Sequence, residues 1–345
     1  MLNKQRDRIL NLSGFVIAAI FLAAAQLKGI LLTFGPHISQ QIEAAQGIIQ
    51  GYPHWRIYQS RILGPFFADV VGKLFQLPFR EAYLLAVFIL LTVFFFILII
   101  TAKRLWNSSI IAIIVAMAAG LFNAIFMQGD WLYLWDYIDL IIFSLLLWSI
   151  LTAKPVWLIS SILVVEIFNR EVAIILIIWF ISDAIVRFKL LDVRWPKIEF
   201  KFRRRQFFVA LALLVLGYIT IELLRSTTLI KEIGPEIFPN IKESGRFVNI
   251  QLLNNFQALR FTLAHPLQNL YFIFNLAIFG IPILILRIMM GNHAGARRVG
   301  FLYLMLWVST VVFGLIYETR VWLSFVPFLV LVCPIILARR LIDYA

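Results

Sequence analysis

The stretch VVEIFNREVAIIL, Val164–Leu176, places Asn169, Arg170 and Glu171 consecutively in one of the most apolar parts of the chain. An unpaired charge in hydrocarbon costs several kcal/mol, so polar residues in such a segment line a cavity, pair with each other or take part in chemistry. Which of these applies depends on where the membrane surfaces fall, and the rest of the sequence indicates where that is.

The chain has 345 residues, of which 62% are hydrophobic and 14% are charged. Runs of about 20 apolar residues recur, and that length spans a bilayer core. We expect an all-α polytopic membrane protein, a single integral membrane domain over residues 1–345, with about ten transmembrane helices. The predicted apolar segments lie near residues 12–34, 82–102, 108–127, 137–153, 156–168, 172–186, 207–224, 267–287, 299–317 and 321–338.

Basic residues are distributed unevenly over the predicted loops. The whole net charge of +13 falls on one side if the amino terminus is cytoplasmic, and the largest cluster is the loop 187–206. This is the positive-inside pattern, so we expect both termini and this loop in the cytoplasm, in a cell inner or plasma membrane. The charge is therefore read as a topology signal, not as a nucleic-acid site.

The same pattern predicts a helical hairpin around the opening stretch. Lys154 and the loop 187–206 must both be cytoplasmic, so the chain between them goes out and returns, turning near Asn169–Glu171. The ascending arm of about 13 residues reaches about 20 Å, less than the roughly 30 Å hydrocarbon core. We expect the tip to lie within the outer leaflet and to line a water-filled pocket.

Two outer segments are long, 35–80 and 226–266. The first contains ISQQIEAAQGIIQG (38–51) and ILGPFFADVVGKLF (62–75), whose apolar residues share helical faces, which predicts amphipathic helices at the interface. The second begins with glycines and prolines before the more helical VNIQLLNNFQALRF (248–261).

Polar residues on the predicted outer side form four groups, YPHWRIYQSR (52–61), GDWLYLWDYID (129–139), the hairpin tip and YETR (317–320). Arginine binds phosphate bidentately and stays charged in poorly hydrated sites. The candidate ligands of a lipid phosphate headgroup are Arg56, Arg61, Arg170 and Arg320, and the candidate lining residues are Tyr58, Trp131, Asp136, Asn169 and Glu318. The structural alternative is that these groups are surface ion pairs, helix caps and an aromatic belt; Glu166 is interpreted as a packing residue.

PHISQQIEAAQGIIQGYPHW (36–55) and YETRVWLSFVPFLVLVCP (317–334), after a cytoplasmic start and one membrane helix, resemble the C-class (GT-C) membrane glycosyltransferases. The residues that fit the first-loop pattern are Ala44, Ala45, Gly51, Trp55 and Pro65, and those that fit the late-helix pattern are Glu318, Arg320 and Pro327. The resemblance implies transfer of a sugar from a polyprenyl-phosphate donor to an acceptor outside the cytoplasm.

One departure from this class concerns the catalytic base. By spacing from Gly51, the first-loop carboxylate of the class would fall at Pro36 or His37, and neither is acidic. The candidates for the base are therefore Asp130, Glu171 and His37, unless the chain is a non-catalytic relative.

Two other classes stay open, a transporter or flippase of a lipid-linked or anionic precursor and a non-catalytic structural subunit of a membrane complex. Clustering of the polar groups on one side favours the enzyme over the transporter. No spacing indicates zinc, whereas Asp130, Asp136 and Asp139 could hold a divalent cation together with lipid phosphate.

Overall fold

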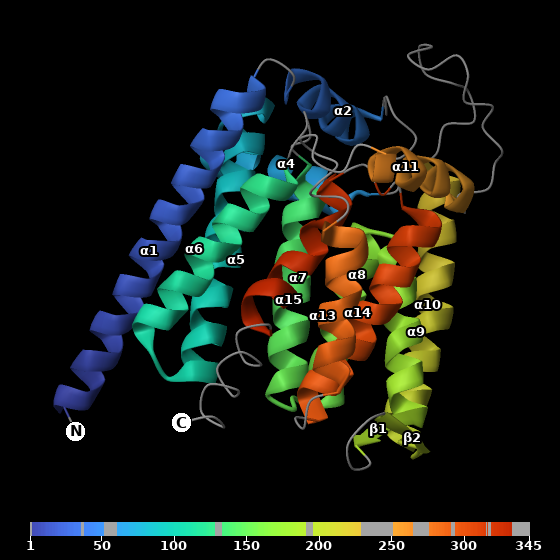
Figure 1. Ribbon diagram of the computed structural model, residues 1–345. Helices are drawn as coiled ribbons and strands as arrows, with labels where there is room; N and C mark the ends of the chain where they lie inside the picture. The colour runs from blue at the N-terminus through green and yellow to red at the C-terminus, as the bar shows by residue number, and fades with distance from the viewer. Residues whose placement is uncertain are drawn as a thin grey trace. The chain divides into compact units, whose positions relative to one another are not determined.

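The computed structural model describes residues 2–35, 38–51, 61–127, 133–190, 196–228, 251–264, 276–290, 294–314, 316 and 319–332. Within these residues the chain is helical apart from one two-stranded hairpin, and six helices are long and apolar enough to cross a membrane (Figure 1). The prediction of a helical integral membrane protein is confirmed at this level.

The six long helices are α1 (Leu2–Phe34), α5 (Phe79–Trp106), α6 (Ser109–Phe126), α7 (Leu134–Leu151), α10 (Arg204–Thr228) and α14 (Ala294–Phe313). Shorter apolar segments form α8 (Val156–Asn169), α9 (Val172–Ile185), the π-helical turn η2 (Leu276–Gly280) with α13 (Ile281–Met289), and the 3-10 helix η3 (Thr319–Phe325) with α15 (Val326–Leu331). The remaining helices are α2 (Ile38–Gln50), α4 (Leu63–Phe75) and α11 (Leu252–Ala264).

The expected total of about ten full spans is not confirmed. The helices α8 and α9 have 14 residues each, so each is about 21 Å long and shorter than the hydrocarbon core. The segments expected at 267–287 and 321–338 continue beyond the described residues, and their described parts are short helices.

The contacts divide the chain into two compact units, each assembled from separate stretches of sequence. The first contains Met1–Glu43, Gly64–Trp148 and Leu323–Ala345, and the second contains Ala44–Leu63 and Ser149–Trp322. In the first unit α1 packs along α5 and α6, and α15 packs against α6 and α5. Its buried core includes the large side chains of Tyr83, Phe94 and Phe95 on α5.

The two amphipathic helices predicted in the first outer loop are present as α2 and α4. Ile38, Ile42 and Ala45 on α2 are buried, as the shared helical face predicted. At the start of α4, a Cβ on Gly64 would lie 2.7 Å from Leu134 Cβ, so only glycine lets α4 approach α7 this closely. Whether these helices lie in the membrane interface stays a prediction.

The second unit is built around α8, α9 and α10, which pack on one another, and α14 packs against α9, α11 and α13 (Figure 1). Gly217 on α10 allows this arrangement, because a Cβ there would lie 3.1 Å from Ile167 Cδ1 on α8 and 3.5 Å from Ile177 Cδ1 on α9. The short hairpin is thus held by a third, longer helix.

The basic loop predicted at 187–206 contains structure that was not expected. The strands β1 (Val186–Leu190) and β2 (Pro196–Phe200) pair antiparallel, with Val186 opposite Phe200 and Leu190 opposite Pro196. The last residues of the predicted loop, from Arg204, already belong to α10. The alternation of Val186, Phe188 and Leu190 with Arg187 and Lys189 was the overlooked strand signal.

Candidate functional site

The predicted hairpin tip is confirmed as a break between two helices. α8 ends at Asn169, Arg170 has an extended backbone, and α9 begins at Val172. The backbone N–H of Arg170 still donates to the carbonyl of Glu166 at 2.9 Å, which closes the last turn of α8. Asn169 is therefore the last residue of α8, and Arg170 and Glu171 form the two-residue connection to α9.

The tip brings together two of the predicted site residues. Arg61, which precedes α4, forms an ion pair with Glu171, with Arg61 Nε 3.7 Å from Glu171 Oε2. This distance is longer than a hydrogen bond but within ion-pair range. The side chain of Arg61 is 13% exposed and that of Glu171 is 32% exposed, so the pair lies at a partly desolvated edge of the molecule.

A small cavity of about 10 Å³, with room for about one water molecule, lies beside Glu171. Arg170, Glu171 and Ile167 from the hairpin form one wall, and Ile221 and Leu224 from α10 form the other. Apolar side chains thus surround an opening that carries one cation and one carboxylate. It is far smaller than the roughly 300 to 1,000 Å³ of typical small-molecule sites, so a headgroup-sized anion does not fit inside it and would bind at its mouth.

A buried polar pair lies in the last turn of α8, and Asn169 of the tip is one of its two members. Asn169 Nδ2 donates to Glu166 Oε2 at 3.2 Å, and both side chains are buried. Glu166 was interpreted as a packing residue, but the structure adds it to the tip cluster. The signal was its spacing, because Glu166 precedes Asn169 by three residues and Arg170 by four, so all three share one end of α8.

Arg320 is the second residue of η3 and also belongs to the second unit. This element is fixed by Trp322 Nε1, which donates to the carbonyl of Ile316 at 3.1 Å, while the Ile316 N–H donates to Asn255 Oδ1 at 3.1 Å. Asn255 Nδ2 in turn donates to the carbonyls of Val311 and Gly314. These bonds fix Ile316, three residues before η3 begins, to the C-terminal end of α14 and to α11.

The other predicted site residues divide into two sets. His37, Arg56, Tyr58, Asp130, Trp131 and Glu318 lie outside the described residues. Asp136 and Asp139 lie buried on α7, and Asp136 belongs to the first unit near Tyr83 and Tyr137. In the described part of the chain, no three His, Cys, Asp or Glu side chains are grouped so that they could hold a metal ion.

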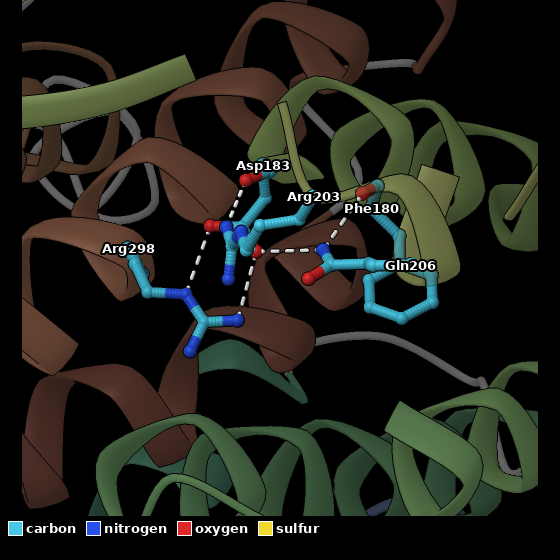
Figure 2. A network of polar contacts seen from close by, with 5 residues as sticks. All are labelled: Phe180, Asp183, Arg203, Gln206 and Arg298. Atoms are coloured by element: carbon cyan, nitrogen blue, oxygen red, sulfur yellow. Dashed lines mark hydrogen bonds and ion pairs between the residues drawn. The ribbon is translucent and has the colours of Figure 1, made fainter. Parts of the chain in front are cut away.

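Asp183, which no sequence motif singled out, is the centre of a buried polar network (Figure 2). Asp183 is 3% exposed and binds Arg298 bidentately, with Nε to Oδ1 and Nη2 to Oδ2 both at 2.8 Å. Arg203 Nη2 lies 2.8 Å from Asp183 Oδ2 and also donates to the Asp183 carbonyl. Gln206 Nε2 donates to Asp183 Oδ2 at 2.8 Å and to the carbonyl of Phe180 at 3.0 Å.

This network joins the last turn of α9 to the start of α10 and to the first turns of α14. It lies next to β1 and β2, because α9 leads directly into β1. The hairpin tip lies at the other end of α9, so the two polar clusters occupy opposite ends of the same unit (Figure 1). A local sequence pattern could not have revealed the pairing, because Asp183 and Arg298 are 115 residues apart.

Comparison with protein-family models, with curated proteins and with solved structures finds no match to this chain. The fold and the two clusters define the class of the protein as a polytopic integral membrane protein with a charged hairpin tip beside a small cavity. Any more specific function rests on the geometry and on the sequence.

Proposed function

We propose that this protein is a GT-C-like glycosyltransferase that moves a sugar from a polyprenyl-phosphate donor to an acceptor on the extracytoplasmic side of the membrane. The observation that carries the proposal is the Arg61–Glu171 ion pair at the break of the α8–α9 hairpin, beside the cavity that Arg170 lines. The proposal rests on two cations and one carboxylate at the mouth of a small cavity in this unit.

The arginines supply what a departing lipid phosphate needs. A guanidinium carries five N–H donors in a planar fork, so it can bind a carboxylate and a phosphate oxygen together. Arg61 pairs with Glu171 at the tip, Arg170 precedes it, and Arg320 in η3 is a third candidate. Fixed cations of this kind stabilise the charge that develops on the leaving phosphate.

Glu171 is the described candidate for the base. Its side chain is about one-third exposed at the mouth of the cavity, so it can be reached by an acceptor hydroxyl from the aqueous side. A base must come within hydrogen-bond reach of the proton that it removes. Asp130 and His37 stay alternative proposals for the base, and Arg56, Tyr58, Trp131, Asn169 and Glu318 stay proposed contacts of the donor or acceptor.

The charge distribution of the second unit supports the proposed orientation. The end that carries β1 and β2 exposes Lys201, Arg204 and Arg205, whereas the hairpin tip lies at the opposite end. Basic residues favour the cytoplasmic side, so the tip and its cavity would open outward, and both termini would be cytoplasmic.

Binding of a polyprenyl phosphate to the detergent-solubilised protein tests the phosphate site, with the matching polyprenol as the probe that lacks the phosphate. Removing one charge-assisted hydrogen bond costs about 1.5 to 3 kcal/mol, so Arg170→Ala should weaken polyprenyl-phosphate binding roughly tenfold to a hundredfold. Arg170→Lys should restore only part of it, because a point charge replaces a fork. Arg260→Ala, an exposed arginine on α11 of the same unit, is the matched control and should bind as the parent does.

Turnover separates chemistry from binding. Mass spectrometry of co-purified lipids would identify the donor class, and release of polyprenyl phosphate from that donor would then be measured. Glu171→Gln should lose turnover and keep donor affinity if Glu171 is the base, because a base acts in the transition state.

Three outcomes would redirect the proposal. Equal binding of polyprenol and polyprenyl phosphate would remove the phosphate site. Movement of the intact donor across a liposome membrane without sugar release would favour a transporter. Folded Arg170→Ala and Glu171→Gln proteins that match the parent in binding and turnover would favour a structural subunit.

A further inference from the structure

The segment that follows β2 directs some of its polar side chains inward and others outward. Arg203 and Gln206 point inward and bind Asp183 (Figure 2). Lys201, Arg204 and Arg205 are exposed. Residues three apart lie on one helical face, so Arg203 and Gln206 can both bind Asp183. These bonds fix the start of α10 with Arg204 and Arg205 facing outward.

Exposed aromatic rings accompany these cations. Phe200 is 81% exposed, and Phe202 and Phe208 are also exposed. The ring of Phe207 contacts the rings of both Phe202 and Phe208, at centroid separations of 5.0 Å and 5.6 Å. The six exposed residues, which we call the basic collar, are Phe200, Lys201, Phe202, Arg204, Arg205 and Phe208.

The basic collar lies where the lipid-facing surface of a membrane span ends. Phe208 begins an exposed apolar side of α10 that continues through Leu211, Val215 and Ile219. Because α10 is long and apolar enough to cross the bilayer, the collar falls at the level of the lipid headgroups. Aromatic rings and cations at that depth meet acyl chains on one side and phosphates on the other.

We propose that the basic collar binds the headgroups of anionic phospholipids on the side of the membrane where β1 and β2 lie. Lys201, Arg204 and Arg205 contact the headgroup phosphates, and Phe200, Phe202 and Phe208 insert at the acyl boundary. The occupant follows from charge complementarity and from continuity with the apolar face of α10. This inference rests on the membrane class alone and is independent of glycosyl transfer.

The test titrates short-chain phosphatidylglycerol and short-chain phosphatidylcholine onto the full-length protein in detergent, at low and high salt. Phosphatidylglycerol should bind more tightly to the parent, and high salt should remove the difference. In Lys201→Gln/Arg204→Gln/Arg205→Gln, the affinity for phosphatidylglycerol should fall roughly fivefold for each removed charge, with phosphatidylcholine binding unchanged. Phe200→Ser should weaken both lipids equally.

The matched control removes three exposed cations elsewhere, in Lys28→Gln/Arg80→Gln/Arg260→Gln, and should bind both lipids as the parent does. Equal loss in the control and in the collar variant would overturn the proposal, because net charge alone would then account for the effect. Competition by inorganic phosphate or by a single-stranded oligonucleotide at the same concentrations would overturn it too, in favour of a general polyanion surface. If the collar variant does not fold, equal affinity of the parent for the two lipids at low salt is the contradicting result.

Discussion

At the scale of single residues, Asp183 shows how one carboxylate can connect three helices. It accepts charge-assisted hydrogen bonds from Arg298 and Arg203 and a further bond from Gln206. Charge-assisted bonds are about twice as strong as neutral ones, and the bidentate fork fixes direction as well as distance. Loss of the carboxylate would leave two partly exposed guanidinium groups close together without the anion that both bind.

Asp183→Ala is therefore expected to lower the free energy of unfolding by about 3 kcal/mol or somewhat less. We expect a smaller loss of stability than for a fully buried ion pair, because water screens the charges. The side chains of Arg298 and Arg203 are 25% and 41% exposed. Thermal unfolding in detergent measures the effect. Asp69→Ala is the matched control, because it removes a surface ion pair with Lys73, and should cost only about 0.5 kcal/mol. Equal effects of the two substitutions would contradict a special role of Asp183.

Residues at the hairpin tip could be predicted from the sequence, whereas Asp183 could not. Asn169, Arg170 and Glu171 interrupt an apolar run, and the positive-inside rule places a turn there, so local information was sufficient. The sequence predicted that Glu171 and Arg61 lie on the same side of the membrane, but it did not predict that they form an ion pair. The partners of Asp183 depend on tertiary packing between α9 and α14, which no local periodicity encodes.

At the scale of elements, the α8–α9 hairpin depends on close packing against α10. Gly217 is the contact point, where a side chain would meet Ile167 at 3.1 Å and Ile177 at 3.5 Å. Gly217→Leu should overpack this contact and lower the free energy of unfolding by about 1 to 3 kcal/mol. Gly217→Ala should be nearly neutral, because the flexible end of Ile167 can shift and alanine favours helix by about 1 kcal/mol over glycine.

Thermal unfolding of both Gly217 variants in detergent checks this expectation. Gly14→Leu on α1 is the matched control, since nothing lies within 4 Å of the Cβ that it would add, and it should not lose stability. A Gly217→Leu protein as stable as the parent would show that α10 does not hold the hairpin as described.

The helices were largely predictable and the strands were not. Apolar runs predicted the cores of the long helices because membrane spans are defined by length and hydropathy. The ends differ, since α1 and α10 extend past the apolar residues into charged ones. β1 and β2 were missed because their cations were read as topology signals, although the alternation of apolar and charged residues was visible.

At the scale of the whole molecule, the prediction to test is which side of the membrane the termini and the loops face. We expect Arg203 and both termini to be cytoplasmic, and Arg56 and Lys242 to be outside. In a Cys333→Ser background, single cysteines at exposed Lys201 and exposed Glu43 would be treated with a membrane-impermeant thiol reagent in intact cells. The Glu43 position should react at once and the Lys201 position only after permeabilisation.

The control for that experiment is a cysteine at Phe21, an exposed residue in the middle of α1 that should be inert from both sides. Rapid labelling of the Lys201 position from outside would reverse the topology and move the hairpin tip to the cytoplasm. The extracytoplasmic site would then be withdrawn, although the internal geometry of the second unit would be unaffected.

The members of the Asp183 network are synthesised at different times, because they lie far apart in the sequence. Arg203 and Gln206 follow Asp183 by 20 and 23 residues, but Arg298 follows it by 115. At about 5 to 20 residues per second, the ribosome would deliver the second arginine roughly 6 to 23 s after the aspartate. A chain that stops before α14 would therefore already hold Asp183 paired with Arg203 and Gln206, but it would lack the bidentate bond that ties α9 to α14. The network thus forms in two stages, first between α9 and the start of α10 and later with α14.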